Sequence, residues 1–196
     1  MKIFLTHGYY LNSDPNELRI MKPYVPLGIL YISAYLKQNG FEVSVFDSTF
    51  QSFEAQKTAL LESKPQVIAI YCNLMTKLNV LPLIKFIKQN DELKKSTIVL
   101  GGPEPPFHAA EFLNYGADII VEGEGEETML ELCRELSKKE PKLESVNGII
   151  FKSAGEVIKT PQREKIKDIN TLPYPDRAAV DLRLYLDAWK KAHGYS

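Results

Sequence analysis

Residues 118–128 read DIIVEGEGEET, and this stretch decides the fold because it joins a strand, a turn and a helix. Asp118–Val121 has the length and apolar character of a buried strand, and glycines follow it at 123 and 125. Helical spacing then begins, with apolar side chains on one face at Met129, Leu132, Cys133 and Leu136. This order of elements is the repeating unit of an α/β protein.

The same unit precedes this stretch four times. Short, mostly apolar runs, as expected of parallel strands covered on both faces, lie at Lys2–Thr6, Glu42–Asp47, Gln66–Tyr71 and Thr97–Leu100. Helical patterns follow them at 26–39, Ser52–Ser63, Lys77–Gln89 and Glu104–Tyr115. Five consecutive units predict an α/β, Rossmann-like (flavodoxin-like) doubly wound fold with a five-stranded parallel sheet.

The alternation ends near residue 140. Val146–Lys152 and Glu156–Thr160 flank a turn that contains Gly155, which predicts a β-hairpin. The proline-rich segment TLPYPDR (171–177) and a helix at Val180–Lys191 follow. We therefore expect a Rossmann-like domain over 1–140 and a hairpin with a linker helix over 141–196.

Composition excludes several classes of function. The formal net charge of −1 provides no basic surface for a nucleic acid. No apolar run approaches the roughly 20 residues of a membrane span. The apolar start of the chain is too short for a signal peptide, and Cys72 and Cys133 are far apart in predicted core elements. These features favour a cytoplasmic protein with two buried thiols.

Known cofactor motifs of this fold are missing at the strand ends, where open parallel sheets bind ligands. Thr6-His7-Gly8-Tyr9 does not supply the dinucleotide fingerprint, and no phosphate-binding loop is present. His7 and Cys72 stand where a phosphoacceptor receiver would carry carboxylates. The three histidines have no partners at metal-ligand spacing, so we predict no metal site and a structural role for His7.

Small and glycine-containing segments follow three predicted strands, and they form the candidate site. These segments are 73–76, 101–104 and 122–125, and a connection of about twenty residues (Thr6–Pro26) lies beside them. Glutamates 126 and 127 fall in the first turn of the next helix, where carboxylates satisfy the helix end and would repel a phosphate. The pattern predicts a large uncharged ligand that approaches the backbone closely.

Five motifs together resemble the N-terminal half of cobalamin-dependent radical SAM enzymes, a class with methyltransferases and an anaerobic magnesium-protoporphyrin monomethyl ester cyclase. In order they are PLGILYISAYL (26–36), GGPEP (101–105), ADIIVEGEGEET (117–128), NGIIF (147–151) and LPYPDR (172–177). The resemblance covers nearly the whole chain. It implies a cobalamin-binding domain, followed by a radical SAM domain of the same polypeptide that acts on a small-molecule substrate.

The resemblance also implies where the cofactors lie. Cobalamin would contact Asn73, Leu74, Thr76, Gly101, Gly102 and Pro103, with Glu122 and Gly123 at the pocket border. The loop from His7 to Pro26 would cover the corrin, and Glu122 or Glu124 would meet its polar amides. The four-iron four-sulfur cluster and S-adenosylmethionine would belong to the downstream domain. No catalytic residue is expected in this chain, which is interpreted as the non-catalytic part of the enzyme.

One departure and two alternatives remain open at this point. Cobalamin mutases carry D-x-H-x-x-G after the first strand, with the histidine on cobalt, and Leu5-Thr6-His7-Gly8 does not match it. Cobalamin would then lack that histidine ligand. The alternatives are a cofactor-free doubly wound binding or regulatory module and a nucleotide-sugar transferase half-domain.

Overall fold

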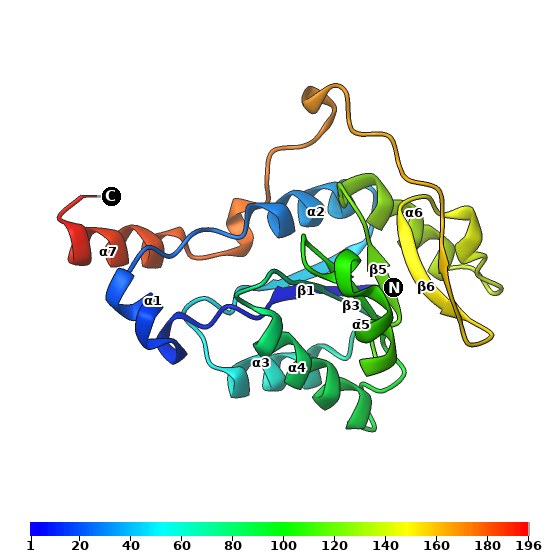
Figure 1. Ribbon diagram of the computed structural model, residues 1–196. Helices are drawn as coiled ribbons and strands as arrows, with labels where there is room; N and C mark the ends of the chain where they lie inside the picture. The colour runs from blue at the N-terminus through cyan, green and yellow to red at the C-terminus, as the bar shows by residue number, and fades with distance from the viewer. Residues whose placement is uncertain (196) are drawn as a thin grey trace.

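The computed structural model describes residues 1–195 and contains one mixed sheet of seven strands in the order β2-β1-β3-β4-β5-β6-β7 (Figure 1). The first five strands are parallel, and they are β1 (Lys2–His7), β2 (Glu42–Phe46), β3 (Val67–Tyr71), β4 (Thr97–Gly101) and β5 (Ile119–Val121). Their order, 2-1-3-4-5, is the flavodoxin-like one. The predicted α/β fold class is therefore confirmed.

Helices cover both faces of the sheet (Figure 1). On one face lie α2 (Leu27–Gln38) and α6 (Glu126–Leu136), and on the other lie α3 (Phe53–Ser63), α4 (Lys77–Gln89) and α5 (Ala109–Tyr115). Successive strand residues alternate between these cores, so that Ile3 and Leu5 face α2 and α6 while Phe4 faces α3 and α4. The near-continuous apolar character of the strands follows from this double covering.

The predicted hairpin is present, and its first strand extends the sheet. β6 (Ile149–Ser153) pairs antiparallel with β5, with Ile150 opposite Ile120, and β7 (Glu156–Lys159) pairs with β6. A short 3-10 turn, η3 (Leu143–Ser145), precedes it. The buried residues of β6, Ile149 to Phe151, are apolar toward both faces, so β6 needs a neighbouring strand and a covering on each side.

Two local departures from the sequence prediction have clear causes. The stretch expected as one helix over Glu104–Tyr115 is divided into a 3-10 turn, η2 (Pro105–His108), and α5. Consecutive prolines at 105 and 106 explain the division, because neither can donate a helical hydrogen bond.

The long β1–α2 connection, residues 8–26, is partly helical, which the sequence analysis did not predict. It contains η1 (Leu11–Ser13) and α1 (Pro15–Ile20). The Asp14 carboxylate accepts hydrogen bonds from the amides of Asn16 at 2.9 Å and Glu17 at 3.2 Å, and Pro15 occupies the first helical position. An acidic N-cap followed by proline is a start signal that was available in the sequence.

The segment after β7 runs back across α6 and α2 to the far end of the sheet, as the orange and red parts of Figure 1 show. It includes η4 (Ile169–Thr171), η5 (Arg177–Ala179) and the terminal helix α7 (Leu182–His193). Arg163 forms ion pairs with Glu127 and Glu131 of α6. Asp176 accepts hydrogen bonds from Ser33 at 2.6 Å and Lys37 at 2.7 Å on α2. Across residues 1–195, no helix has the length and hydropathy needed to span a bilayer.

Candidate functional site: two joined clefts at the carboxyl edge of the sheet

The first cleft lies between the sheet and helices α2 and α6, and has a volume of about 220 Å³. Strand residues Leu5, Ala69, Val99 and Val121 line the sheet side of the cleft. Helix residues close its sides, and they are Ile29, Ile32 and Met129. These strands flank the point where strand order reverses, between β1 and β3, which is where open α/β sheets bind ligands.

Glycines keep the first cleft open. Gly28, Gly101 and Gly123 line it, and a Cβ added at any of them would meet no atom within 4 Å. Because these glycines line the cleft, a side chain at any of the three positions would project into it. The backbone is thus exposed to whatever the cleft holds.

Gly102 has a different requirement, because its backbone φ is +99°. A Cβ at this position would also lie 2.4 Å from the carbonyl oxygen of Cys72 and 3.0 Å from the ring of Tyr71. Only glycine satisfies both restraints without a rearrangement of the β3 end. The two consecutive glycines thus serve different purposes.

The second cleft, of about 260 Å³, shares Gly28, Ile29 and Tyr71 with the first, so the two clefts adjoin at these residues. Its other lining residues come mainly from both ends of the β1–α2 loop: His7, Tyr9, Tyr24, Val25, Pro26, Leu27 and, from the β3–α4 turn, Thr76. The rings of Tyr9 and Tyr24 stack with centroids 5.6 Å apart. The Tyr9 hydroxyl donates to Glu17 at 2.7 Å. Burial of the Tyr9 hydroxyl is the main cause that raises its pKa, and the Glu17 carboxylate raises that pKa further. Aromatic and neutral polar groups therefore surround this cleft.

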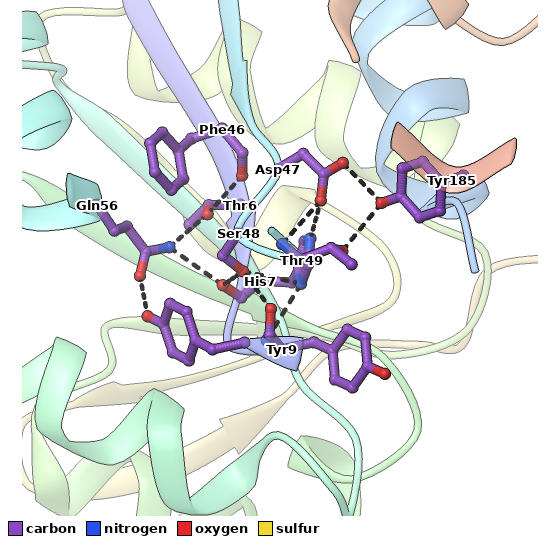
Figure 2. Close-up of polar contacts among 10 residues, drawn as sticks. Thr6, His7, Tyr9, Phe46, Asp47, Ser48, Thr49, Gln56 and Tyr185 are labelled. Atoms are coloured by element: carbon purple, nitrogen blue, oxygen red, sulfur yellow. Dashed lines mark hydrogen bonds and ion pairs between the residues drawn. The ribbon is translucent and has the colours of Figure 1, made fainter. Parts of the chain in front are cut away.

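A buried polar network surrounds His7, which lines the second cleft (Figure 2). The backbone amide of Tyr9 donates to His7 Nδ1 at 3.2 Å, so Nδ1 is an acceptor and the ring proton is on Nε2. His7 Nε2 therefore donates to Asp47 Oδ1 at 3.0 Å. The Ser48 hydroxyl lies between Nδ1 and the carbonyl oxygens of His7 and Tyr9. His7 has the structural role that the sequence analysis predicted for it.

Asp47 is the centre of this network. Its Oδ1 also accepts from the Thr49 amide at 3.1 Å, and its Oδ2 accepts from the Tyr185 hydroxyl of α7 at 2.7 Å (Figure 2). Burial alone would raise the pKa of Asp47, but the hydrogen bonds from His7 and Tyr185 outweigh it and lower that pKa. Burial and the Asp47 charge raise the pKa of Tyr185, which remains a hydrogen-bond donor.

The acidic stretch after β5 forms one wall of the first cleft and begins α6. Glu126 and Glu127 occupy the first turn of α6, as predicted. Glu126 lines the first cleft, and burial together with the neighbouring charge of Glu124 raises its pKa. Gly125 allows close packing there, since a Cβ would lie 2.8 Å from Ile32 Cδ1.

The structure brings five of the nine predicted site residues to the clefts. Four of them line the first cleft, namely Gly101, Gly102, Gly123 and Glu124, and Thr76 lines the second. Asn73 lies behind Thr76 and exchanges hydrogen bonds of 3.0 Å with it. Leu74 is 75% exposed and Pro103 is also exposed, outside both clefts. The Glu122 carboxylate accepts from Lys159 of β7 at 2.8 Å.

The helix residues of the clefts were not among the predicted site residues. Gly28, Ile29 and Ile32 belong to α2 and Met129 to α6, and only Met129 was part of a predicted apolar stripe. Tyr24 and the rest of the loop were predicted only as a cover. The available signal was Gly28 itself, because glycine in the first turn of a helix lowers helix stability and calls for another reason.

Both cysteine thiols are free and buried, as expected, and burial raises the pKa of Cys72 and of Cys133 to about 12. Neither thiol is thus activated as a nucleophile. Among residues 1–195, no group of three or more His, Cys, Asp or Glu side chains is arranged to hold a metal ion.

The fold and the clefts define a flavodoxin-like α/β domain with two adjoining clefts, the first lined by glycines, at its topological switch point. Residues 19–133 match the B12-binding domain family, and the chain belongs to that family. It resembles the N-terminal cobalamin-binding domains of cobalamin-dependent radical SAM enzymes. The resemblance found in the sequence motifs is therefore confirmed.

Three relatives illustrate this likeness. The chain is 26% identical over 164 residues to an uncharacterized methyltransferase, PH0819, of Pyrococcus horikoshii, a match that covers 82% of this chain and 35% of that protein. It is 32% identical over 120 residues to 4'-phospho-dehydrooxetanocin synthase of Priestia megaterium, across 59% of this chain and 16% of that protein. The cobalamin-dependent S-adenosylmethionine radical enzyme OxsB, solved with aqua-cobalamin bound, superposes with a TM-score of 0.74 at 27% identity. That match covers 89% of this chain and 24% of OxsB.

Proposed function

We propose that this chain binds cobalamin in the joined clefts and serves as the cobalamin-binding part of a longer radical SAM enzyme. The observation that carries the proposal is the glycine-lined hollow at the switch point of a B12-binding family domain. Cobalamin, when bound, supplies a cobalt centre able to carry a methyl group or assist radical chemistry. The residues of this chain would hold it and exclude water from its surroundings.

The lining of the clefts suits parts of such a cofactor. The walls of the first cleft are mostly apolar, with Glu124 and Glu126 at one side, which suits the aromatic base of a nucleotide tail, and its glycines admit a ligand close to the backbone. The second cleft carries stacked tyrosine rings and the Thr76 hydroxyl, which suit a flat macrocycle with polar amides. The cobalamin contacts that the resemblance implies for Asn73, Leu74, Pro103 and Glu122 stay a prediction.

His7 is not available as a cobalt ligand in this arrangement. Its Nδ1 accepts from Tyr9 and its Nε2 donates to Asp47, so both ring nitrogens are engaged within the protein. Release of either nitrogen would leave a buried partner without a hydrogen bond. Bound cobalamin is therefore expected without His7 as a ligand, in keeping with the missing D-x-H-x-x-G motif.

The remainder of the enzyme is also part of the proposal. The chain spans 35% and 16% of the two curated relatives, so the iron–sulfur cluster, S-adenosylmethionine and a small-molecule substrate would be bound by a further domain. Residues 1–140 would form the cobalamin-binding domain and 141–196 the connection to that domain. β6 pairs with β5, so this connection begins as a continuation of the sheet.

The nucleotide-sugar alternative has less support. A diphosphate at the start of α6 would meet the carboxylates of Glu126 and Glu127, which already occupy the first turn of that helix. The cofactor-free alternative differs from the proposal in one measurable property, which is the retention of a corrinoid.

Retention of hydroxocobalamin tests the proposal directly. The purified chain, mixed with hydroxocobalamin and passed through gel filtration, is expected to keep the visible absorption of the corrin. Gly101→Leu should lose at least about tenfold in affinity, because its side chain would fill the first cleft. Its thermal stability should be close to that of the wild type, because the new Cβ meets no atom within 4 Å and the rest of the side chain would extend into the open cleft.

Ala110→Leu is the matched control, because it adds comparable bulk on an exposed position of α5. It should retain the corrin as the wild type does. Absence of corrin from the wild-type protein would overturn the proposed function. Retention by Gly101→Leu equal to that of the control would instead remove the first cleft from the site.

The pH dependence of binding provides a second test. Glu126 already has a raised pKa, and a ligand in the first cleft would bury it further and raise that pKa more. Binding should then take up a proton, so affinity should increase as the pH falls from about 7.5 to about 5, by at most about tenfold per pH unit. Titrations with cyanocobalamin, whose upper ligand does not titrate in this range, measure the effect. Glu126→Gln should bind with little pH dependence, and an unchanged slope in that variant would contradict the assignment.

A further inference from the structure

The terminal helix α7 contacts the β1–α2 loop through Trp189 and His193, and the segment that follows β2 through Tyr185. The Tyr185 hydroxyl donates to Asp47 Oδ2 at 2.7 Å and lies 2.9 Å from the Thr49 hydroxyl. Trp189 Nε1 donates to the carbonyl of Pro23 at 2.9 Å, and His193 Nε2 lies 3.0 Å from the carbonyl of Met21. These contacts join segments far apart in sequence.

The three residues are spaced four apart, so they lie on one face of α7. Tyr185 is the buried residue of the helix, and its ring packs edge-on against Phe50 with centroids 4.8 Å apart. Trp189 and His193 stack further along the same face, at 5.1 Å. The far side of the helix carries Leu184, which is 42% exposed. The contact face thus joins two segments, the loop at Met21 and Pro23 and the stretch from Asp47 to Phe50.

The loop segment that α7 holds, residues 21–26, forms a wall of the second cleft. Tyr24, Val25 and Pro26 line that cleft and follow Pro23 directly. The segment has no helix or strand of its own, and the carbonyls of Met21 and Pro23 accept from α7. Among residues 1–195, no α7 residue lines either cleft.

Tyr185 also reaches the floor of the second cleft. It bonds Asp47, and Asp47 accepts from His7, whose side chain lines the cleft (Figure 2). The helix is thus linked to two lining residues of the cleft, to Tyr24 through its neighbour Pro23 and to His7 through Asp47. Undocking of α7 would leave both without these partners.

We infer that Tyr185 and Trp189 are positioning residues, through which the docking of α7 orders residues 21–26 over the second cleft. Occupancy of the cleft and docking of α7 are then coupled, and the coupling acts equally in both directions. A ligand strengthens the docking of α7, and docked α7 slows the release of the ligand. The part of this inference that concerns a ligand rests on the proposed function, whereas the ordering of the loop does not.

Amide hydrogen exchange on the ligand-free chain tests the ordering. Tyr185→Phe removes the hydrogen bonds to Asp47 and Thr49, and Trp189→Phe removes the one to Pro23; both keep an aromatic ring. Exchange in residues 21–27 and in α7 should therefore become about three- to tenfold faster. Exchange in β3 and α4 should not change. Leu184→Ala, on the exposed far side of the same helix, is the control and should leave residues 21–27 unaffected. Faster exchange that is confined to α7 would overturn the inference.

Exchange with bound hydroxocobalamin tests the coupling. The corrin should slow exchange in α7, although α7 lines neither cleft, and Tyr185→Phe should reduce this protection and speed corrin release about three- to tenfold. Unchanged α7 exchange in the corrin complex would refute the coupling. If the wild-type protein retains no corrin, the proposed function fails, and the ligand-free experiment alone decides whether α7 orders the loop.

Discussion

Gly102→Ala is expected to destabilise the domain by about 2–4 kcal/mol, the largest effect of any single methyl group in the site. The backbone φ of +99° disfavours any side chain, and the new Cβ would lie 2.4 Å from the Cys72 carbonyl oxygen. That oxygen belongs to the backbone just after β3 and cannot move without disturbing the strand end. Urea unfolding measures the loss, and corrin retention should fall with it because Gly102 lines the first cleft.

Gly101→Ala is the control at the neighbouring position. Its Cβ would meet nothing within 4 Å, and its φ lies outside the left-handed region, so its free energy of unfolding should stay within about 0.5 kcal/mol of the wild type. Equal stability of the two alanine variants would show that the β3 end adapts freely, and the argument for Gly102 would be wrong.

Asp47→Ala should cost about 3–5 kcal/mol of unfolding free energy. The substitution removes the acceptor of three donors, namely the His7 ring, the Thr49 amide and the Tyr185 hydroxyl. At least the first two are buried groups that would lose their partner, which is more costly than the loss of an exposed contact. Because Tyr185 would also lose its main partner, exchange in α7 should rise as it does in Tyr185→Phe.

The pH dependence of stability has a definite sign at Asp47. Its pKa is lowered in the folded state, so its contribution is fully present above the unfolded pKa of about 3.9 and is lost as the pH falls through the folded value. Asp176, whose pKa Lys37 and Ser33 lower against the effect of burial, adds a loss in the same range. Thermal unfolding between about pH 7 and about pH 3 should therefore show a smaller acid-induced decrease for Asp47→Asn than for the wild type. An identical decrease would mean that Asp47 is not stabilised as a carboxylate.

The fold was predictable because its signals are local. Each parallel strand is a short apolar run, and each boundary has a nearby marker, such as Ser52, whose side chain caps α3, or Gly40 after α2. The glycine segments at 101–102 and 123 could be placed in the site because the carboxyl ends of parallel strands share one edge of the sheet. The parallel direction of the strands was sufficient to place these glycines together.

The helical half of the site was not predictable in the same way. Which side of α2 faces the cleft depends on how α2 packs beside α6, where Gly125 lies against Ile32. The pairing of β6 with β5 likewise requires two segments about thirty residues apart to meet. Periodicity identifies the buried stripe of a helix but not the element that buries it.

The sequence by itself determined the α/β class, the order of the elements, the family and the strand-end part of the site, because local pattern and short motifs carry that information. Only the tertiary structure decided that the clefts join, that α2 and α6 complete them, and that Tyr185 bonds Asp47 across 138 residues. The physical reason is that a contact between distant segments depends on the packing of everything between them. No local preference of Tyr185 or Asp47 specifies such a contact.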